Sequence, residues 1–467
     1  MGSQSKNNER GVERDDDFMR AISISKIELG ADAHSLASAA CHKAERPQVH
    51  VATLGARQHY ALPKLLHRSG MLGCFYTDLY VNPASFLFRL LQRIPSKLRP
   101  RWMERLLGRS DGKLPAWKVV SFDAFGLWYQ WQVWRARDSE ALSRVYVRTN
   151  QSFNHRIIRQ GLKGADVIYG YDGAALELFQ YAKEQAIPCI LEQAIIPQDM
   201  VRSFLKEEVE RWPGWEPGLR VEDEEGVFQE RQKEEWRLAH LIVGASSFVI
   251  ESLRQYHVPE AKQRLVPYGI PLERFSPRQR GESPASGKLH ILFAGDVNLR
   301  KGAQYLLEAL RAMNSTQFEA KFAGTLALDP ARLMSYQGMA TFLGSVPRNK
   351  MMELYDWADL FVLPSICEGS ALVTYEALAS GIPVIVTPNT GAWVRDGVDG
   401  VIVPIRDVNA LTGAIERFCK DPEFLKFCSR HALEGRERLG LDAYESRLLR
   451  IIMEVCGRGM SEAGEGQ

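Results

Sequence analysis

The clearest pattern in the chain is a series of short, continuous apolar runs separated by stretches with helical periodicity. In the second half of the sequence these runs lie at 289–294, 319–323, 340–343, 360–363, 383–387 and 401–403. Helical stretches follow several of them, at 301–313, 348–356, 370–380 and 407–420. Apolar strands without polar alternation are buried on both faces, so the pattern predicts a doubly wound parallel α/β sheet.

The first half of the sequence repeats this alternation less regularly. Strands are predicted at 49–53, 72–76, 166–171, 188–191 and 241–244. Helices are predicted from about Tyr60, over 174–186, over 205–237 with a Trp-Pro-Gly turn at 212–218, and after a cap at Ser246 or Ser247. The order strand, helix, strand again favours a parallel sheet.

Two segments without periodicity divide the chain. A charged leader covers 1–45, and a linker rich in Gly, Pro and Ser covers 276–288. They delimit two Rossmann-like domains, 46–275 and 289–440. Apolar residues with helical spacing predict a last helix over 441–457.

One segment of the first domain, 86–135, interleaves aromatic and apolar residues with cations. Between Phe86 and Lys118, nine Lys or Arg accompany only two acids, Glu104 and Asp111. We predict a helical insertion on the rim of the domain. Two interpretations stay open: a surface for a membrane or an acceptor, and a cover that packs its tryptophans on its own domain.

The bulk composition is that of an ordinary globular protein, with 45% hydrophobic and 25% charged residues. A formal net charge of +2 gives no support to nucleic-acid binding. The seven cysteines have no metal-ligand spacing, and neither a signal peptide nor a run of 18 apolar residues is visible. We therefore expect a cytoplasmic location, with peripheral contact at the inner face of the membrane as an alternative.

The strongest chemical signal follows the strand at 360–363. Glu368, Gly369 and Ser370 stand in the loop after this strand, and the next helix carries a second acid, Glu376. Ligands bind at the carboxyl ends of parallel strands, and the first N–H groups of a helix suit a diphosphate. Glu368 can reach a sugar hydroxyl from the loop, and Glu376 can accept both hydroxyls of a ribose. Two solvated, structural glutamates are the alternative.

A second signal follows the strand at 289–294. This strand leads into Gly295, and Arg300 and Lys301 stand at the start of the next helix. Cations are unfavourable at a helix N-terminus, and a bound anion would resolve that conflict. A solvated pair of cations is the alternative.

Together these residues resemble family 4 of the retaining glycosyltransferases (glycosyl transferases group 1), which have the GT-B fold. The resemblance is strong over 290–420 and weaker over 47–270. It rests on Glu368 and Glu376 with seven residues between them, Arg300-Lys301-Gly302, Asn389-Thr390-Gly391 ahead of Asp399-Gly400, and Val266-Pro267-Tyr268-Gly269-Ile270. One departure is Asp296, which stands where many members carry Arg.

The resemblance implies an acceptor-side N-terminal domain that faces a nucleotide-sugar-binding C-terminal domain across a cleft, with helix 441–457 crossing back to the first domain. Lys301, with Arg300 beside it, would neutralise the donor diphosphate, Glu376 would hold the ribose, and Glu368 would hold the transferred sugar. Further donor contacts would come from Gly55, Gly295, Val346, Gly369, Ser370, Ala371 and Leu372.

His59, at the end of the first glycine loop, would face the same cleft and help position the acceptor or the donor sugar. A structural histidine is the alternative. Asn154 and His155 are similarly placed, and the case for them is weaker.

The expected reaction is hexosyl transfer, with retention, from a nucleotide sugar to a saccharide, lipid-linked or small-molecule acceptor. Cations and helix N–H donors would stabilise the leaving group, so we expect neither a metal nor a cofactor. The alternatives are a catalytically silent sugar-nucleotide-binding scaffold, against which the intact Glu368, Glu376 and Lys301 argue, and a GT-B phosphorylase or epimerase.

Overall fold

The structure of the chain is a computed structural model that describes residues 46–83, 93–94, 103, 107–136, 139–221, 226–280, 287–313 and 317–457. The predicted leader lies outside these residues. So do 281–286 of the predicted linker and most of the first part of the predicted insertion.

Seven parallel strands form the sheet of the N-terminal domain, in the order β3-β2-β1-β4-β5-β6-β7. The strands are β1 (Val49–Thr53), β2 (Leu72–Thr77), β3 (Val119–Ser121), β4 (Val167–Tyr171), β5 (Cys189–Gln193), β6 (Leu241–Gly244) and β7 (Gln263–Leu265). The helices of this half are α2 (Ala61–Arg68), α5 (Asp123–Arg135), α6 (Ser139–Gln160), α7 (Leu176–Glu184), α8 (Gln198–Arg211), α9 (Val227–Leu238) and α10 (Ser247–Gln255). Every residue of β1, β4 and β5 is buried, as expected for a sheet covered on both faces.

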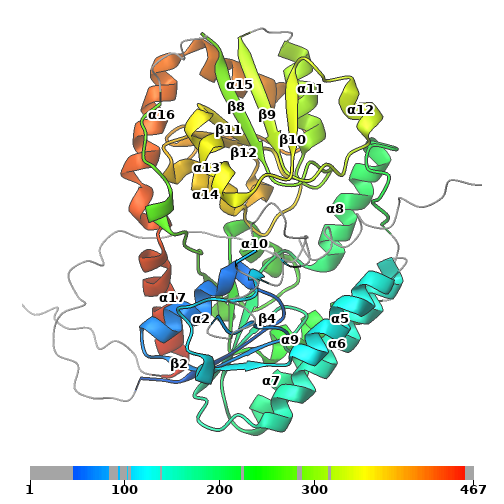
Figure 1. Ribbon diagram of the computed structural model, residues 1–467, viewed down its shortest axis with the longest axis vertical. Coiled ribbons are helices and arrows are strands. Elements are labelled where there is room, and N and C mark those ends of the chain that lie inside the picture. The colour runs from blue at the N-terminus through cyan, green and yellow to red at the C-terminus, as the bar shows by residue number, and fades with distance from the viewer. Residues whose placement is uncertain are drawn as a thin grey trace, which may run out of the picture.

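Six parallel strands form the sheet of the C-terminal domain, in the order β10-β9-β8-β11-β12-β13. They are β8 (Leu289–Ala294), β9 (Phe318–Ala323), β10 (Ala340–Gly344), β11 (Leu360–Leu363), β12 (Val384–Val386) and β13 (Gly400–Ile402). The helices are α11 (Ala303–Met313), α12 (Pro330–Met334), α13 (Arg348–Trp357), α14 (Leu372–Ala379), α15 (Val408–Lys420), α16 (Pro422–Glu434) and α17 (Leu441–Val455). The predicted architecture of two doubly wound parallel sheets is therefore confirmed (Figure 1).

The structure departs from the prediction in the segment 86–135. The predicted insertion is not helical throughout, because 119–121 forms β3, which pairs in parallel with β2 at the edge of the sheet. All three residues of β3 are only half-buried, so the strand shows no continuous apolar run that the sequence could reveal. α5 follows it and packs against α6 (Figure 1).

A second departure concerns the chain after α8, which the sequence assigned to the first domain. Trp215 is buried in the core of the C-terminal domain, and the indole Nε1 of Trp212 donates to the hydroxyl of Tyr305 over 3.1 Å. Figure 1 shows α8 rising beside the C-terminal domain. The end of α8 and the chain to residue 219 therefore pack on the C-terminal domain, although they lie between two strands of the N-terminal sheet in sequence. The start of α8 stays on the N-terminal domain, where Asp199 accepts a hydrogen bond of 2.6 Å from Gln229 and Val201 packs with Val249.

α17 makes the opposite crossing. Tyr444, Leu448 and Ile452 are buried in the core of the N-terminal domain, and Arg68 of α2 pairs with Asp442 at 2.6 Å. The two crossings, α17 and α8, lie on opposite sides of the view in Figure 1, and each connects one domain to the other.

The described end of the predicted linker is packed rather than extended. The backbone N–H of Arg280 donates to Ser429 Oγ over 2.6 Å, and its guanidinium donates to the carbonyl oxygen of Tyr355 over 2.7 Å. Among the helices of the described ranges, none is both long enough and apolar enough to cross a membrane.

Candidate active site

A tight loop between β8 and α11 brings two cations to the carboxyl edge of the C-terminal sheet. Gly295 has a φ of 127°, which favours glycine. A Cβ atom at this position would lie 2.8 Å from both Cδ and Cε of Lys301. Gly302 has a φ of 72°, and a Cβ atom there would lie 1.9 Å from the carbonyl oxygen of Pro364. The two glycines therefore allow Lys301 to fold over the loop and the loop to pack on the end of β11.

Residues from the α8 crossing support this loop from behind. The carboxylate of Glu216 accepts a hydrogen bond of 2.8 Å from the backbone N–H of Leu299. Glu208, which is fully buried, accepts hydrogen bonds of 2.9 Å from Gln304 and Tyr305, and it pairs with Arg406 at 2.6 Å. The position of the cation loop thus depends on a segment that comes from the first half of the sequence.

Glu368 holds both cations of the loop. Its Oε1 lies 3.0 Å from Nη1 of Arg300 and 2.7 Å from Nζ of Lys301, and the residue is 1% exposed. The structure therefore brings together three of the residues that the sequence singled out. The carboxylate predicted to meet a sugar hydroxyl lies directly on the two cations.

The charges of this cluster stabilise one another. Burial acts to raise the pKa of Glu368, but Arg300 and Lys301 outweigh burial, and together they hold that pKa below its ordinary value. Glu368 likewise keeps the pKa of Arg300 raised against the effect of burial, with a further contribution from Asp296. Asp296, which replaces the expected arginine, thus adds a negative charge near Arg300 rather than a third cation.

Glu376 lies in a separate polar group on α14. Its Oε2 accepts a hydrogen bond of 2.7 Å from the hydroxyl of Tyr355, which is fully buried. The charge of Glu376 also acts on Arg348, at the start of α13. Burial raises the pKa of Tyr355 well above its ordinary value, and the nearby carboxylate adds to this rise. The hydroxyl of Tyr355 therefore remains a donor that orients Glu376.

The turn from Gly369 to Leu372 is held by the segment 389–391. The N–H of Glu368 donates to Asn389 O over 3.0 Å, and the N–H of Ala371 donates to Thr390 O over 3.2 Å. α14 begins after Ala371, whose side chain has no oxygen to cap the helix. No side-chain cap at Ala371 competes for the backbone N–H groups of the first turn, so an anion can bind them.

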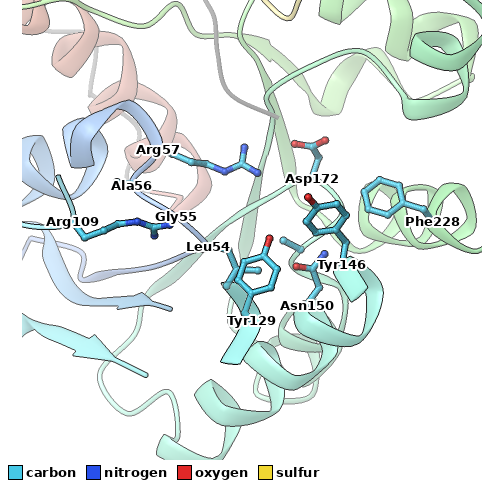
Figure 2. A pocket seen from close by; sticks show the side chains of 11 residues that line it. Leu54, Gly55, Ala56, Arg57, Arg109, Tyr129, Tyr146, Asn150, Asp172 and Phe228 are labelled. Carbon is cyan, nitrogen blue, oxygen red and sulfur yellow. The ribbon is translucent and has the colours of Figure 1, made fainter. Parts of the chain in front are cut away.

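The N-terminal domain contains a pocket of about 180 Å³ at the carboxyl ends of β1 and β4 (Figure 2). It is lined by Leu54, Gly55, Ala56, Arg57, Arg109, Tyr129, Tyr146, Asn150, Asp172, Ala174 and Phe228. Tyrosine, amide, carboxylate and guanidinium groups around a small apolar wall suit a polar ligand with several hydroxyl groups.

Buried acids fix the cationic side of this pocket. Asp78, which is fully buried, accepts a hydrogen bond of 2.8 Å from the N–H of Gly55 and pairs with Arg109 at 3.0 Å. Arg57 stacks on the ring of Tyr171 at 4.5 Å, and Figure 2 shows its guanidinium extending toward Asp172. Burial raises the pKa of Asp172, while the charge of Arg57 opposes that rise.

His59 lies in a strained turn that approaches the C-terminal domain. Gln58, His59 and Tyr60 have consecutive φ values of 47°, 49° and 60°, a left-handed conformation that costs about 1 kcal/mol or more for each such residue. Desolvation lowers the pKa of His59 to about 4, and the charges of Arg348, Lys64 and Arg274 act in the same direction, although the residue keeps an exposed surface. His59 is therefore neutral near pH 7 and electrostatically coupled to the same Arg348 that responds to Glu376.

Other residues that the sequence singled out lie elsewhere. Val346 is half-buried beside the C-terminal core, on the loop before α13. Asn154 is buried in α6, where its amide donates to Glu177 over 2.8 Å, and it does not line the pocket. His155 is exposed on the same helix.

A family model for glycosyl transferases group 1 matches residues 288–421, which include the cation loop, Glu368 and Glu376. The C-terminal domain of the chain is therefore similar to the group 1 glycosyltransferases over these residues. Among its relatives, D-inositol 3-phosphate glycosyltransferase from Thermobispora bispora is 28% identical over 267 residues, which cover 52% of this chain and 60% of that protein. The chain thus spans less than two thirds of that relative's length.

Solved structures of other proteins share the fold of this chain. Sucrose-phosphate synthase from Thermosynechococcus elongatus superimposes with a TM-score of 0.61 at 17% identity, over 88% of this chain and all of that one. HepE from Anabaena, in complex with UDP-glucose, gives a TM-score of 0.54 at 14% identity, over 87% of this chain and 99% of that one.

Several residues of the candidate site were missed by sequence reasoning. Asp78 and Arg109 lie 31 positions apart and meet only through the fold, so no local motif could reveal them. Arg348 and Tyr355 share one helix seven positions apart, a spacing that places both on the same side of α13 and offered a usable signal.

Proposed function

We propose that this chain is a retaining, metal-independent hexosyltransferase that takes its sugar from a nucleoside diphosphate sugar and transfers it to a hydroxyl group of an acceptor bound in the N-terminal pocket. The observation that carries the proposal is the cluster in which Glu368 fixes Arg300 and Lys301 beside the uncapped start of α14.

The donor half of the proposal follows from charge and geometry. A diphosphate needs several donors and cations in a fixed arrangement, and the pair Arg300 and Lys301, together with backbone N–H groups of a helix, is such an arrangement. Glu376, oriented by Tyr355, offers a carboxylate oxygen for the two hydroxyls of a ribose. The similarity in fold to HepE in complex with UDP-glucose supports the same class of donor.

In the proposed reaction, the acceptor oxygen forms a bond to the anomeric carbon as the bond from that carbon to the β-phosphate oxygen breaks. The acceptor proton passes to the leaving diphosphate, and attack from the same face retains the anomeric configuration. Lys301 and Arg300 stabilise the charge that develops on the leaving diphosphate, which is the role a divalent cation has in other transferases.

The acceptor half of the proposal rests on the pocket of Figure 2. Asn150, Tyr146 and Asp172 supply hydroxyl-binding groups, and Arg57 and Arg109 supply cations. Neutral His59 has a ring nitrogen that can accept a hydrogen bond between the two halves of the site.

The test begins with calorimetric titration of UDP, GDP and ADP into the full chain. We expect one of them to bind, and Lys301→Ala to weaken that binding by about tenfold or more, because a charge-assisted contact to phosphate is lost. Lys350→Ala is the matched control, since Lys350 is exposed on α13 and pairs only with its helix neighbour Glu353 in the ion pairs of the described residues.

Transfer is then measured with the sugar form of the nucleotide that binds. NMR of the product is expected to show the anomeric configuration of the donor, and EDTA is expected to leave the rate unchanged. Binding of the nucleotide sugar without transfer and without hydrolysis would favour a silent sugar-nucleotide-binding scaffold instead. Unchanged nucleotide affinity in Lys301→Ala would contradict the assignment of the diphosphate site.

A further inference from the structure

α5 and Trp117, which lies two residues before β3, expose several large apolar side chains. Their exposed fractions are 78% for Trp117, 59% for Leu127, 41% for Trp128, 46% for Trp131 and 66% for Trp134. These five are half of the ten large apolar side chains that are exposed within the described residues, and they fall within 18 positions of sequence. They lie close together in sequence rather than scattered over the chain, and we call the four that lie on α5 the α5 aromatic face.

The helix is two-sided. Leu127, Trp131 and Trp134 follow the i, i+4, i+7 spacing of one helix face. Phe125, Tyr129 and Val133 are buried, and α5 packs against α6. The core side of α5 is therefore already satisfied, and the aromatic face is additional to what the fold needs.

The chemistry of the face is that of a membrane interface. The guanidinium of Arg135 stacks over Trp131 at 4.7 Å, and the ammonium of Lys118 lies 5.0 Å from the ring of Trp117. The sequence that leads into the face, 86–118, has nine Lys or Arg and two acids. Tryptophan prefers the headgroup region, and cations beside it favour anionic lipids.

The same helix forms a wall of the N-terminal pocket. Tyr129 of α5 lines that pocket and packs edge-on against Tyr146 of α6, with ring centroids 6.2 Å apart. Trp128, the preceding residue, is exposed. A surface that seats α5 therefore also sets the distance between that surface and the pocket.

We propose that the α5 aromatic face seats the protein on an anionic lipid bilayer, and that the pocket behind α5 takes the polar head of an acceptor anchored in that bilayer. The second half of this inference rests on the proposed transferase function, and the first half does not.

Flotation of the full chain with lipid vesicles tests the docking surface. We expect co-flotation with phosphatidylcholine vesicles that contain phosphatidylglycerol, and little with phosphatidylcholine alone. The triple variant Leu127→Gln, Trp131→Gln, Trp134→Gln is expected to reduce the bound fraction by about tenfold or more, because three interfacial side chains are lost. Met334→Gln, which changes a residue 63% exposed on α12 of the C-terminal domain, is expected to bind like the wild type.

Three outcomes would overturn the proposal. The first is a wild-type chain that floats with neither vesicle, and the second is a triple variant that floats as well as the wild type. The third is a wild-type dimer in light scattering that the triple variant turns into a monomer, which would assign the face to a second copy of the chain. Thermal unfolding of each variant checks that it is folded. If the triple variant does not fold, the single variant Trp134→Gln replaces it in the flotation assay, and a smaller loss of vesicle binding is expected.

The acceptor half has its own assay. With an acceptor lipid in the vesicles, the rate of sugar transfer by the triple variant is expected to fall by about tenfold or more, in proportion to its lost membrane binding. On a soluble acceptor, the triple variant is expected to have the same transfer rate as the wild type. Equal loss on both acceptors would contradict the proposed role of the bilayer. Loss of transfer by the wild type on every acceptor, with flotation intact, would contradict the transferase proposal and leave the docking surface standing.

Discussion

The hydroxyl of Ser246, at the start of α10 in the N-terminal domain, donates a hydrogen bond of 2.5 Å to the carbonyl oxygen of Gly369 in the C-terminal domain. Ser246 is fully buried, and its oxygen also accepts a hydrogen bond of 3.2 Å from the N–H of Val249 as the cap of α10. Gly391 packs against both partners, since a Cβ atom there would lie 2.4 Å from the oxygen of Gly369. One hydroxyl therefore connects the helix start of one domain to the turn that precedes α14.

Ser246→Ala should remove both bonds at once. We expect a loss of stability of about 1 kcal/mol from the cap alone, and a several-fold rise in KM for the donor because the turn at Gly369 loses its support. Ser252→Ala is the matched control, because Ser252 is equally buried on α10 and donates only within that helix, to Val249 O. Donor KM and thermal unfolding separate the two effects. If the control raises donor KM as much as Ser246→Ala does, the contact between the domains is not what supports the turn.

Gly295→Ala should displace Lys301. The new methyl group would lie 2.8 Å from two carbons of the lysine side chain, and the φ of 127° adds backbone strain. We expect nucleotide affinity to fall by about tenfold or more, through the displaced cation. Gly413→Ala in α15, where a Cβ atom meets nothing within 4 Å, should instead be neutral or stabilise by up to about 1 kcal/mol. An unchanged nucleotide affinity in Gly295→Ala would show that nucleotide binding does not depend on the close packing of Lys301 against Gly295.

Glu368→Gln should separate positioning from charge. The amide has nearly the shape of the carboxylate but leaves Arg300 and Lys301 buried without their counter-charge, which costs about 3–5 kcal/mol in comparable buried pairs. We expect a lower unfolding temperature and a transfer rate reduced by about 100-fold. Saturating nucleotide should restore much of the stability, since a diphosphate supplies the missing negative charge. A variant that nucleotide does not stabilise would contradict this explanation.

The stability of the fold should decline in mild acid. Burial lowers the pKa of His50 to about 4 from an ordinary value of 6.5, against the opposing charge of Asp166. Between these two values the unfolded chain binds a proton that the folded chain does not, so the free energy of unfolding falls as pH drops from 6.5 to 4, by up to about 3 kcal/mol. Urea denaturation of His50→Gln should show a flatter pH dependence over this range. An unchanged slope would show that other groups control acid unfolding.

How far the sequence predicts the site depends on whether its residues are local. Gly295, Arg300 and Lys301 share one loop, and Glu368 and Glu376 lie in the turn after β11 and in the helix that follows it, so pattern and spacing were enough to single them out. The strands β3 and β7 are three-residue edge strands with half-buried positions, which carry no continuous apolar run. The pairs Asp78–Arg109 and Ser246–Gly369 join residues that are distant in sequence and meet only through the fold.

The excess of cations in 86–135 predicted less about the structure than the other sequence signals did. It marked 86–135 as unusual, and the exposed tryptophans of α5 lie there, but it could not say which side of α5 faces the core. That distinction depends on α6, whose Tyr146 and Val145 pack against Tyr129 and Val133.

The burial of Trp215 has a practical consequence for recombination between related transferases. A chimera spliced at the linker would inherit α8 and Trp215 from one parent and the surface that receives them from the other. Its C-terminal half would then receive a mismatched α8 segment next to the loop that carries Arg300 and Lys301, whatever N-terminal domain was grafted. Exchanges that move 198–219 together with the C-terminal half should yield well-folded hybrids more often than a single cut at 276–288.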